Sequence, residues 1–135
     1  MSYNALTRHY FETAACAGVL DAPGTLRGAA GSRAQGTWVQ FDVEIAAAAG
    51  VRTVHAVRFL AFGCPHVIAV AAWVAERAVG LAAEARLPES VGSLRERFAV
   101  PVEKTGRLLI VEDAWITALG RIAARPPEAE SGRRP

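Results

Sequence analysis

Residues 37–62, TWVQFDVEIAAAAGVRTVHAVRFLAF, carry the clearest structural signal in this chain, because a strand pattern stands on each side of a short connection. In the first pattern, apolar and polar residues alternate, as in a half-buried strand. The apolar set is Val39, Phe41, Val43 and Ile45, and the polar set is Gln40, Asp42 and Glu44. After the small residues 46–50, a second strand over residues 51–62 places Val57, Phe59 and Ala61 on one face. The two patterns predict a β-hairpin.

The segments that follow the hairpin change to helical spacing. Residues 65–79 predict a helix with Pro65 at its first position and Gly80 past its end, and we expect it to be buried because it is apolar nearly all round. Residues 88–98 predict a short amphipathic surface helix, and residues 106–123 predict a final helix. The side chains that the final helix would bury are Leu108, Val111, Trp115, Leu119 and Ile122.

Weaker patterns precede the hairpin. Residues 4–15 have apolar side chains at near-helical spacing and a candidate cap in Ser2 or Asn4, which predicts an N-terminal helix. Residues 26–33 are interrupted by glycine and predict an irregular edge strand. Strands followed by helices indicate an α+β domain, with a three-stranded antiparallel sheet and helices packed on one of its faces.

Length and composition indicate one folded domain. The chain has 135 residues, of which 52% are apolar and 21% charged, an ordinary balance for a single core. We expect a domain over residues 1–124. Residues 125–135, RPPEAESGRRP, have almost no apolar content, which predicts a disordered tail.

Charge and cysteine content narrow the function classes. The net charge is +2 and the basic residues are scattered singly, so nucleic acid is not expected as a partner. The apolar run of residues 67–75 is too short to cross a membrane, and the first residues lack the apolar stretch of a signal peptide, so a cytoplasmic location is expected. Two cysteines, Cys16 and Cys64, make a disulfide-stapled scaffold improbable.

Four stretches resemble the IscU/NifU-type iron-sulfur cluster assembly scaffolds over roughly residues 8–122, and three of them end by residue 69. AVRFLAFGCPHVIA, residues 56–69, is similar to the family's strand that ends in aromatic-glycine-cysteine before a buried helix, and Cys64 falls on that central cysteine. RHYFETAACAGVLD, residues 8–21, resembles the family's opening, and GAAGSRAQGT, residues 28–37, resembles the glycines before its first cysteine motif. The resemblance implies the SufE/NifU-like fold, a scaffold and not an enzyme.

At the metal site the sequence departs from the family's pattern. The replacements are Gln35 for the first cysteine, Thr37 for the aspartate, Gly106 for the histidine and Arg107 for the third cysteine. Cys64 alone keeps its ligand, so the resemblance implies a degenerate member that lacks most metal ligands. Iron-sulfur clusters are normally held by four cysteine thiolates. A cluster or an iron ion, if held, would therefore be held weakly or shared between two chains of a homodimer.

Residues 100–119, VPVEKTGRLLIVEDAWITAL, resemble the family's chaperone-binding segment and final helix. Pro101 and Lys104 fall on the proline-containing, lysine-ending motif, whereas Val102 replaces its second proline. The resemblance implies a cysteine desulfurase and an Hsp70-type chaperone system as partners.

Two side chains at the predicted strand-helix corner have open interpretations. Cys64 precedes a helix start, where backbone N–H groups, the helix dipole and a nearby Arg107 would favour a thiolate. Equally, Cys64 could be a small packed residue that closes the corner. His66 could supply a substitute metal ligand, although a surface or capping role in the first helical turn is the commoner one.

Three functions follow from these observations. The first is a scaffold-like protein that binds iron or iron-sulfur cargo weakly, or an accessory that docks on the cluster assembly machinery. The second is a thiol-dependent enzyme or a persulfide carrier that uses Cys64, with His66 as a candidate base. The third is a protein-interaction module with a vestigial site.

Overall fold

The computed structural model describes residues 3–14 and 16–122, so the predicted tail at residues 125–135 lies outside the described residues. The described elements, in order, are helix α1 (Ala5–Thr13), strands β1 (Leu26–Ser32), β2 (Thr37–Ala48) and β3 (Val51–Phe62), helices α2 (Pro65–Ala78) and α3 (Val91–Arg97), a 3-10 turn at Val102–Lys104, and helix α4 (Thr105–Gly120). Among them no helix has the length and apolar content needed to span a bilayer.

The described strands form one antiparallel sheet in the order β1-β2-β3, which confirms the predicted hairpin and edge strand. Phe41 of β2 lies opposite Phe59 of β3. The predicted connection at residues 46–50 was too long. Strand β2 continues to Ala48, and the turn needs only Ala49 and Gly50, whose φ angles of 53° and 78° suit a two-residue hairpin turn.

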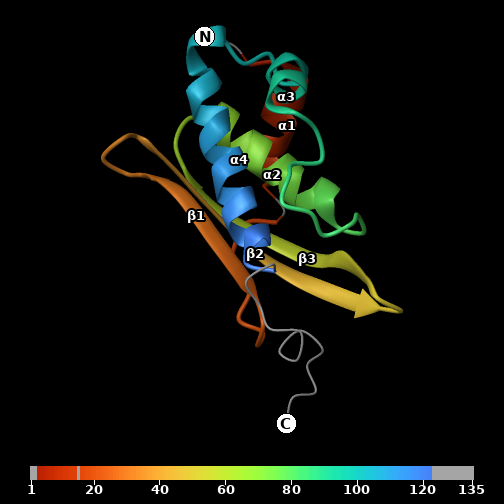
Figure 1. Ribbon diagram of the computed structural model, residues 1–135. Helices are drawn as coiled ribbons and strands as arrows, with labels where there is room; N and C mark the ends of the chain where they lie inside the picture. The colour runs from red at the N-terminus through yellow and green to blue at the C-terminus, as the bar shows by residue number, and fades with distance from the viewer. Residues whose placement is uncertain (1–2, 15, 123–135) are drawn as a thin grey trace.

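All the described helices lie on one face of the sheet, as predicted (Figure 1). Helices α2 and α4 pack directly on the strands, whereas α1 packs against α2, and α3 packs against α4. The core is contributed by the inward residues of β2 and by nearly the whole of α2. Trp115 of α4 meets Phe41 of β2 edge-on, with ring centroids 5.3 Å apart. This contact joins α4 to the sheet.

Two helix predictions need correction. The segment at residues 88–98 is helical only over α3, because Ser90 caps it by accepting a hydrogen bond from the backbone N–H of Ser93 at 3.1 Å. The 3-10 turn before α4 was not predicted, and it begins directly after Pro101. Of the predicted buried residues of α4, Leu108, Val111, Trp115 and Leu119 are buried, while Ile122 is partly buried just past the helix end.

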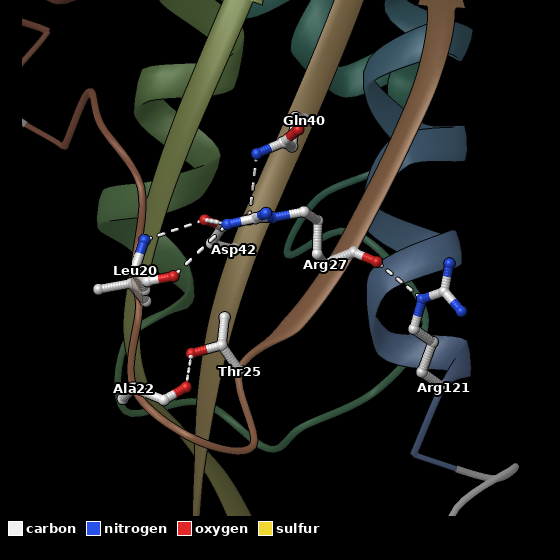
Figure 2. Close-up of polar contacts among 7 residues, drawn as sticks. All are labelled: Leu20, Ala22, Thr25, Arg27, Gln40, Asp42 and Arg121. Atoms are coloured by element: carbon white, nitrogen blue, oxygen red, sulfur yellow. Dashed lines mark hydrogen bonds and ion pairs between the residues drawn. The ribbon is translucent and has the colours of Figure 1, made fainter.

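Alternation places Asp42 on the polar face of β2, yet its side chain is only 1% exposed. The chain before β1 crosses this face, and the backbone N–H of Leu20 donates to the Asp42 carboxylate at 2.9 Å (Figure 2). Arg27 of β1 donates two further hydrogen bonds to it, at 2.7 and 2.8 Å. An acid that alternation assigns to solvent is buried because a distant segment covers it.

Candidate functional site

The candidate site lies at the end of the sheet where β3 passes into α2. Cys64 occupies the N-cap position of α2, directly before Pro65. The turn between β1 and β2 reaches the same corner, because a Cβ atom placed on Gly63 would lie 3.5 Å from the carbonyl oxygen of Gly36. The register agrees, since Trp38 at the start of β2 lies opposite Phe62 at the end of β3. Sheet pairing thus brings residues far apart in the sequence to one corner.

The Cys64 thiol is polarised toward its thiolate form. Burial raises its pKa, but this effect is outweighed by the backbone N–H of Val67, the Arg107 guanidinium and the backbone N–H of His66, so the pKa of Cys64 lies below its usual value. The side chain is only partly buried. The thiolate is therefore favoured by the start of one helix and by a cation from the start of another.

His66 is buried, with 3% of its surface exposed, so its interpretation as a surface residue was wrong. Tyr3 lies edge-on against the imidazole, with ring centroids 4.8 Å apart. Burial and the nearby charges of Lys104 and Arg107 lower the pKa of His66, which favours the neutral ring. Within the described residues its Nδ1 atom has no hydrogen-bond partner. No hydrogen bond joins the ring to Cys64 there, which does not favour His66 as the base of a thiol enzyme.

The positions that the resemblance aligns with the family's metal ligands are distributed around this corner. Gln35 is exposed in the β1–β2 turn, where its backbone N–H donates to Ser32 Oγ at 3.1 Å. Thr37 is buried at the start of β2, and Gly106 and Arg107 are exposed in the first turn of α4. The geometry places Arg107 beside Cys64 and the turn that carries Gln35 beside Gly63.

These side chains do not form a four-ligand metal site. Within residues 3–14 and 16–122, no group of three or more His, Cys, Asp and Glu side chains converges. Cys16, the other cysteine, lies along the outer edge of β3, where its carbonyl oxygen accepts a hydrogen bond from Phe59 at 3.0 Å. A cluster normally needs four thiolates, and Arg107 brings a positive charge next to Cys64. The described residues of one chain therefore do not assemble that set of ligands.

The segment that resembles the family's chaperone-binding motif, residues 100–104, lies next to the site. Pro101 accepts a hydrogen bond from the backbone N–H of Lys104 at 2.9 Å, which closes the 3-10 turn before α4. Val102, which the resemblance aligns with the second proline of the motif, is 68% exposed. The sequence interpretation did not single out Arg33, whose guanidinium lies over the Phe62 ring, 5.2 Å from its centroid. Arg33 could have been predicted to lie near Phe62 only from the pairing of β2 with β3, and the sequence does not give that register.

Comparison with known proteins finds matches to a family model and to solved structures. The family model described as NifU-like N terminal domain matches residues 2–125. A crystal structure described as an iron-sulfur cluster assembly scaffold protein for the SUF system (FiSufU), from thermophilic Fervidobacterium islandicum AW-1, superposes with a TM-score of 0.62. The alignment covers 87% of this chain and 96% of that chain at 12% identity, so it concerns the fold alone. A search of curated proteins gives no match.

Proposed function

The chain belongs to the family of NifU-like N-terminal domains, and from this premise we propose that it is an accessory of iron-sulfur cluster assembly that builds no cluster on a single chain. Proteins of this family act as scaffolds and not as enzymes in the usual sense. The observation that carries the proposal is that the Arg107 guanidinium lies beside Cys64. The family's pattern has a cysteine thiolate at the position of this cation. The fold is kept while the ligand set is not.

The ligand shortage can be tested by restoring the missing side chains. Together, Gln35→Cys, Gly106→His and Arg107→Cys would add three metal ligands to Cys64. All three positions are exposed. Thr37 is best left unchanged, because an aspartate there would bury a charge. After anaerobic incubation with ferrous iron and sulfide, we expect visible absorption and bound iron in the restored variant and neither in the wild-type chain.

The matched control carries the same three substitutions and Cys64→Ala. It should lose the colour and the iron, because the fourth ligand is gone. A wild-type monomer that holds a stoichiometric cluster, lost on Cys64→Ala alone, would contradict the proposal. If the wild-type chain holds a cluster only in a species with the mass of a dimer, the cluster is instead shared between two chains.

Docking on the assembly machinery is the second part of the proposal. The family membership supports a cysteine desulfurase and an Hsp70-type chaperone as partners, and so does the segment next to the site in which Val102 is exposed and Lys104 half-buried. Size-exclusion chromatography of the chain mixed with each purified partner measures this directly. Absence of a complex with both partners, in the presence of nucleotide for the chaperone, would remove the accessory role.

A persulfide carrier is a second candidate, because the pKa of Cys64 is lowered. The Cys64 thiolate would attack the outer sulfur of a donor persulfide, the sulfur-sulfur bond of the donor would break, and the donor would leave as a thiolate. Cys64 would then carry one added sulfur atom. Mass spectrometry after incubation with a desulfurase and free cysteine should detect that added sulfur on Cys64 and not on Cys16. An unmodified Cys64 would exclude this candidate.

A further inference from the structure

A cavity of about 740 Å³ lies away from Cys64, between the end of α2, the following loop and the middle of α4. Apolar side chains, among them Leu81, Leu87 and Trp115, make up much of its wall. Glu112 of α4 also lines it. This combination of apolar wall and charged group is typical of recognition sites.

The loop that forms one wall is held in place before any partner arrives. Its first residues pair with the start of β3, where Val54 donates to Leu81 at 2.9 Å and accepts from Gly80 at 2.8 Å. Further along, the Trp115 indole N–H donates to the carbonyl oxygen of Arg86 at 2.9 Å. A partner would therefore lose little affinity to ordering of this wall.

The apolar surface continues from the cavity onto the outer side of α4. Leu109 and Ile116 are 45% and 39% exposed, and they lie three residues before and four residues after Glu112. Residues at these spacings are neighbours on one side of a helix. We call the cavity together with Leu109, Glu112, Asp113 and Ile116 the α4 groove.

The α4 groove carries negative charge that the described residues leave unpaired. Its other two glutamates are engaged, Glu84 with Arg86 at 2.9 Å and Glu89 with Arg97. Glu112 and Asp113 have no ion-pair or hydrogen-bond partner among residues 3–14 and 16–122. Helix α4 has no lysine or arginine after Arg107. A complementary partner would supply apolar side chains together with cations.

We propose that the α4 groove binds an amphipathic basic helix of a partner protein. The large apolar side chains of that helix would pack against Leu109, Ile116 and the cavity wall. Its lysine or arginine side chains would face Glu112 and Asp113. In helix-in-groove recognition the bound helix places its apolar anchors at i, i+3, i+4 and i+7, which would set them along this apolar surface. A second copy of this chain fits poorly, because a two-fold contact would oppose like carboxylates. This surface is separate from Cys64, so the inference does not depend on the proposed function.

The probe is a synthetic amidated peptide with leucines at i, i+3, i+4 and i+7 and arginines on its other face. NMR titration of the full chain at low salt should shift the Leu81 and Arg86 amides and the Trp115 indole signal. The double variant Glu112→Gln, Asp113→Asn should bind about 5- to 10-fold more weakly, as expected for two rim charges. Ile116→Ser should also weaken binding, because it removes an exposed anchor.

The matched control is Glu12→Gln, Glu96→Gln, which removes two exposed carboxylates elsewhere. It should bind like wild type, and a peptide with glutamates in place of the arginines should not bind. Circular dichroism confirms that each surface variant is folded. Equal affinity of both double variants for the basic peptide, or shifts confined to the Cys64 corner, would overturn the proposal.

Discussion

Arg107 and Cys64 form the pair of residues on which the chemistry of the candidate site depends. Arg107→Gln should raise the pKa of Cys64, because the cation that favours the thiolate is removed. Alkylation of Cys64 by iodoacetamide at neutral pH should then slow several-fold, which mass spectrometry can follow. Arg95→Gln removes a charge on α3 and serves as the control. An unchanged alkylation rate in Arg107→Gln would show that the helix start alone activates the thiol.

On the face of the sheet away from the helices, Asp42 is the residue whose substitution should lower the free energy of unfolding most. Asp42→Ala leaves Leu20 and Arg27 without their acceptor and should lower the free energy of unfolding by about 2–4 kcal/mol. Asp113→Ala removes an exposed acid of α4 whose side chain has no partner among the described residues, and it should change the free energy of unfolding by less than about 0.5 kcal/mol. Urea unfolding measures both, and equal effects would contradict the structural role of Asp42.

The same carboxylate makes stability depend on pH. Burial raises the pKa of Asp42, but the Arg27 hydrogen bonds, the Leu20 N–H and Gln40 outweigh burial, so the folded pKa lies below the ordinary value of 3.8. The stabilisation is therefore fully present above that value and is lost as the pH falls through the lower folded pKa. The difference in unfolding free energy between wild type and Asp42→Ala should shrink in this acid range. A difference that is constant with pH would rule out linkage through Asp42.

At the scale of elements, the close contact between β1 and α4 depends on the absence of a side chain at Gly28. A Cβ atom on Gly28 would lie 2.2 Å from the backbone nitrogen of Ala118 and 2.7 Å from the carbonyl oxygen of Ala114. Gly28→Ala should push α4 from the sheet and destabilise the protein by about 1–3 kcal/mol. Thermal unfolding followed by circular dichroism measures this loss.

Gly106 provides the matched control for that substitution. Nothing lies within 4 Å of a Cβ atom there, and the residue is in the first turn of α4. Gly106→Ala should therefore be neutral or stabilise by up to about 1 kcal/mol, because alanine favours helix. Destabilisation by Gly106→Ala as large as that by Gly28→Ala would show that crowding between α4 and β1 is not the cause.

The whole molecule should unfold as one unit. Trp73 of α2 and Trp115 of α4 are both buried in a single core that joins helices and sheet. Tryptophan fluorescence and far-ultraviolet circular dichroism should therefore report the same urea midpoint. Trp38→Phe restricts the fluorescence to the two core tryptophans. Separate midpoints in that variant would show that the helical layer and the sheet unfold independently.

The sequence by itself determined the elements and their order. Alternation over Val39 to Val43 and the switch to helical spacing after Gly63 are local patterns, and each was confirmed as a strand or helix of nearly the predicted length. The placement of Cys64 at a helix start was equally local, because proline follows it directly. Element ends were less well predicted, as at Ala48, because a tight turn leaves little sequence signal.

Only the tertiary structure decided which polar groups are buried and which charges meet. Asp42 is covered by the segment of Leu20, and His66 by Tyr3, residues that lie far from them in the sequence. The α4 groove likewise combines Glu112 with a loop that precedes it by more than twenty residues. Periodicity reports the spacing of neighbours along one element, whereas burial and electrostatics depend on which distant segments fold against it.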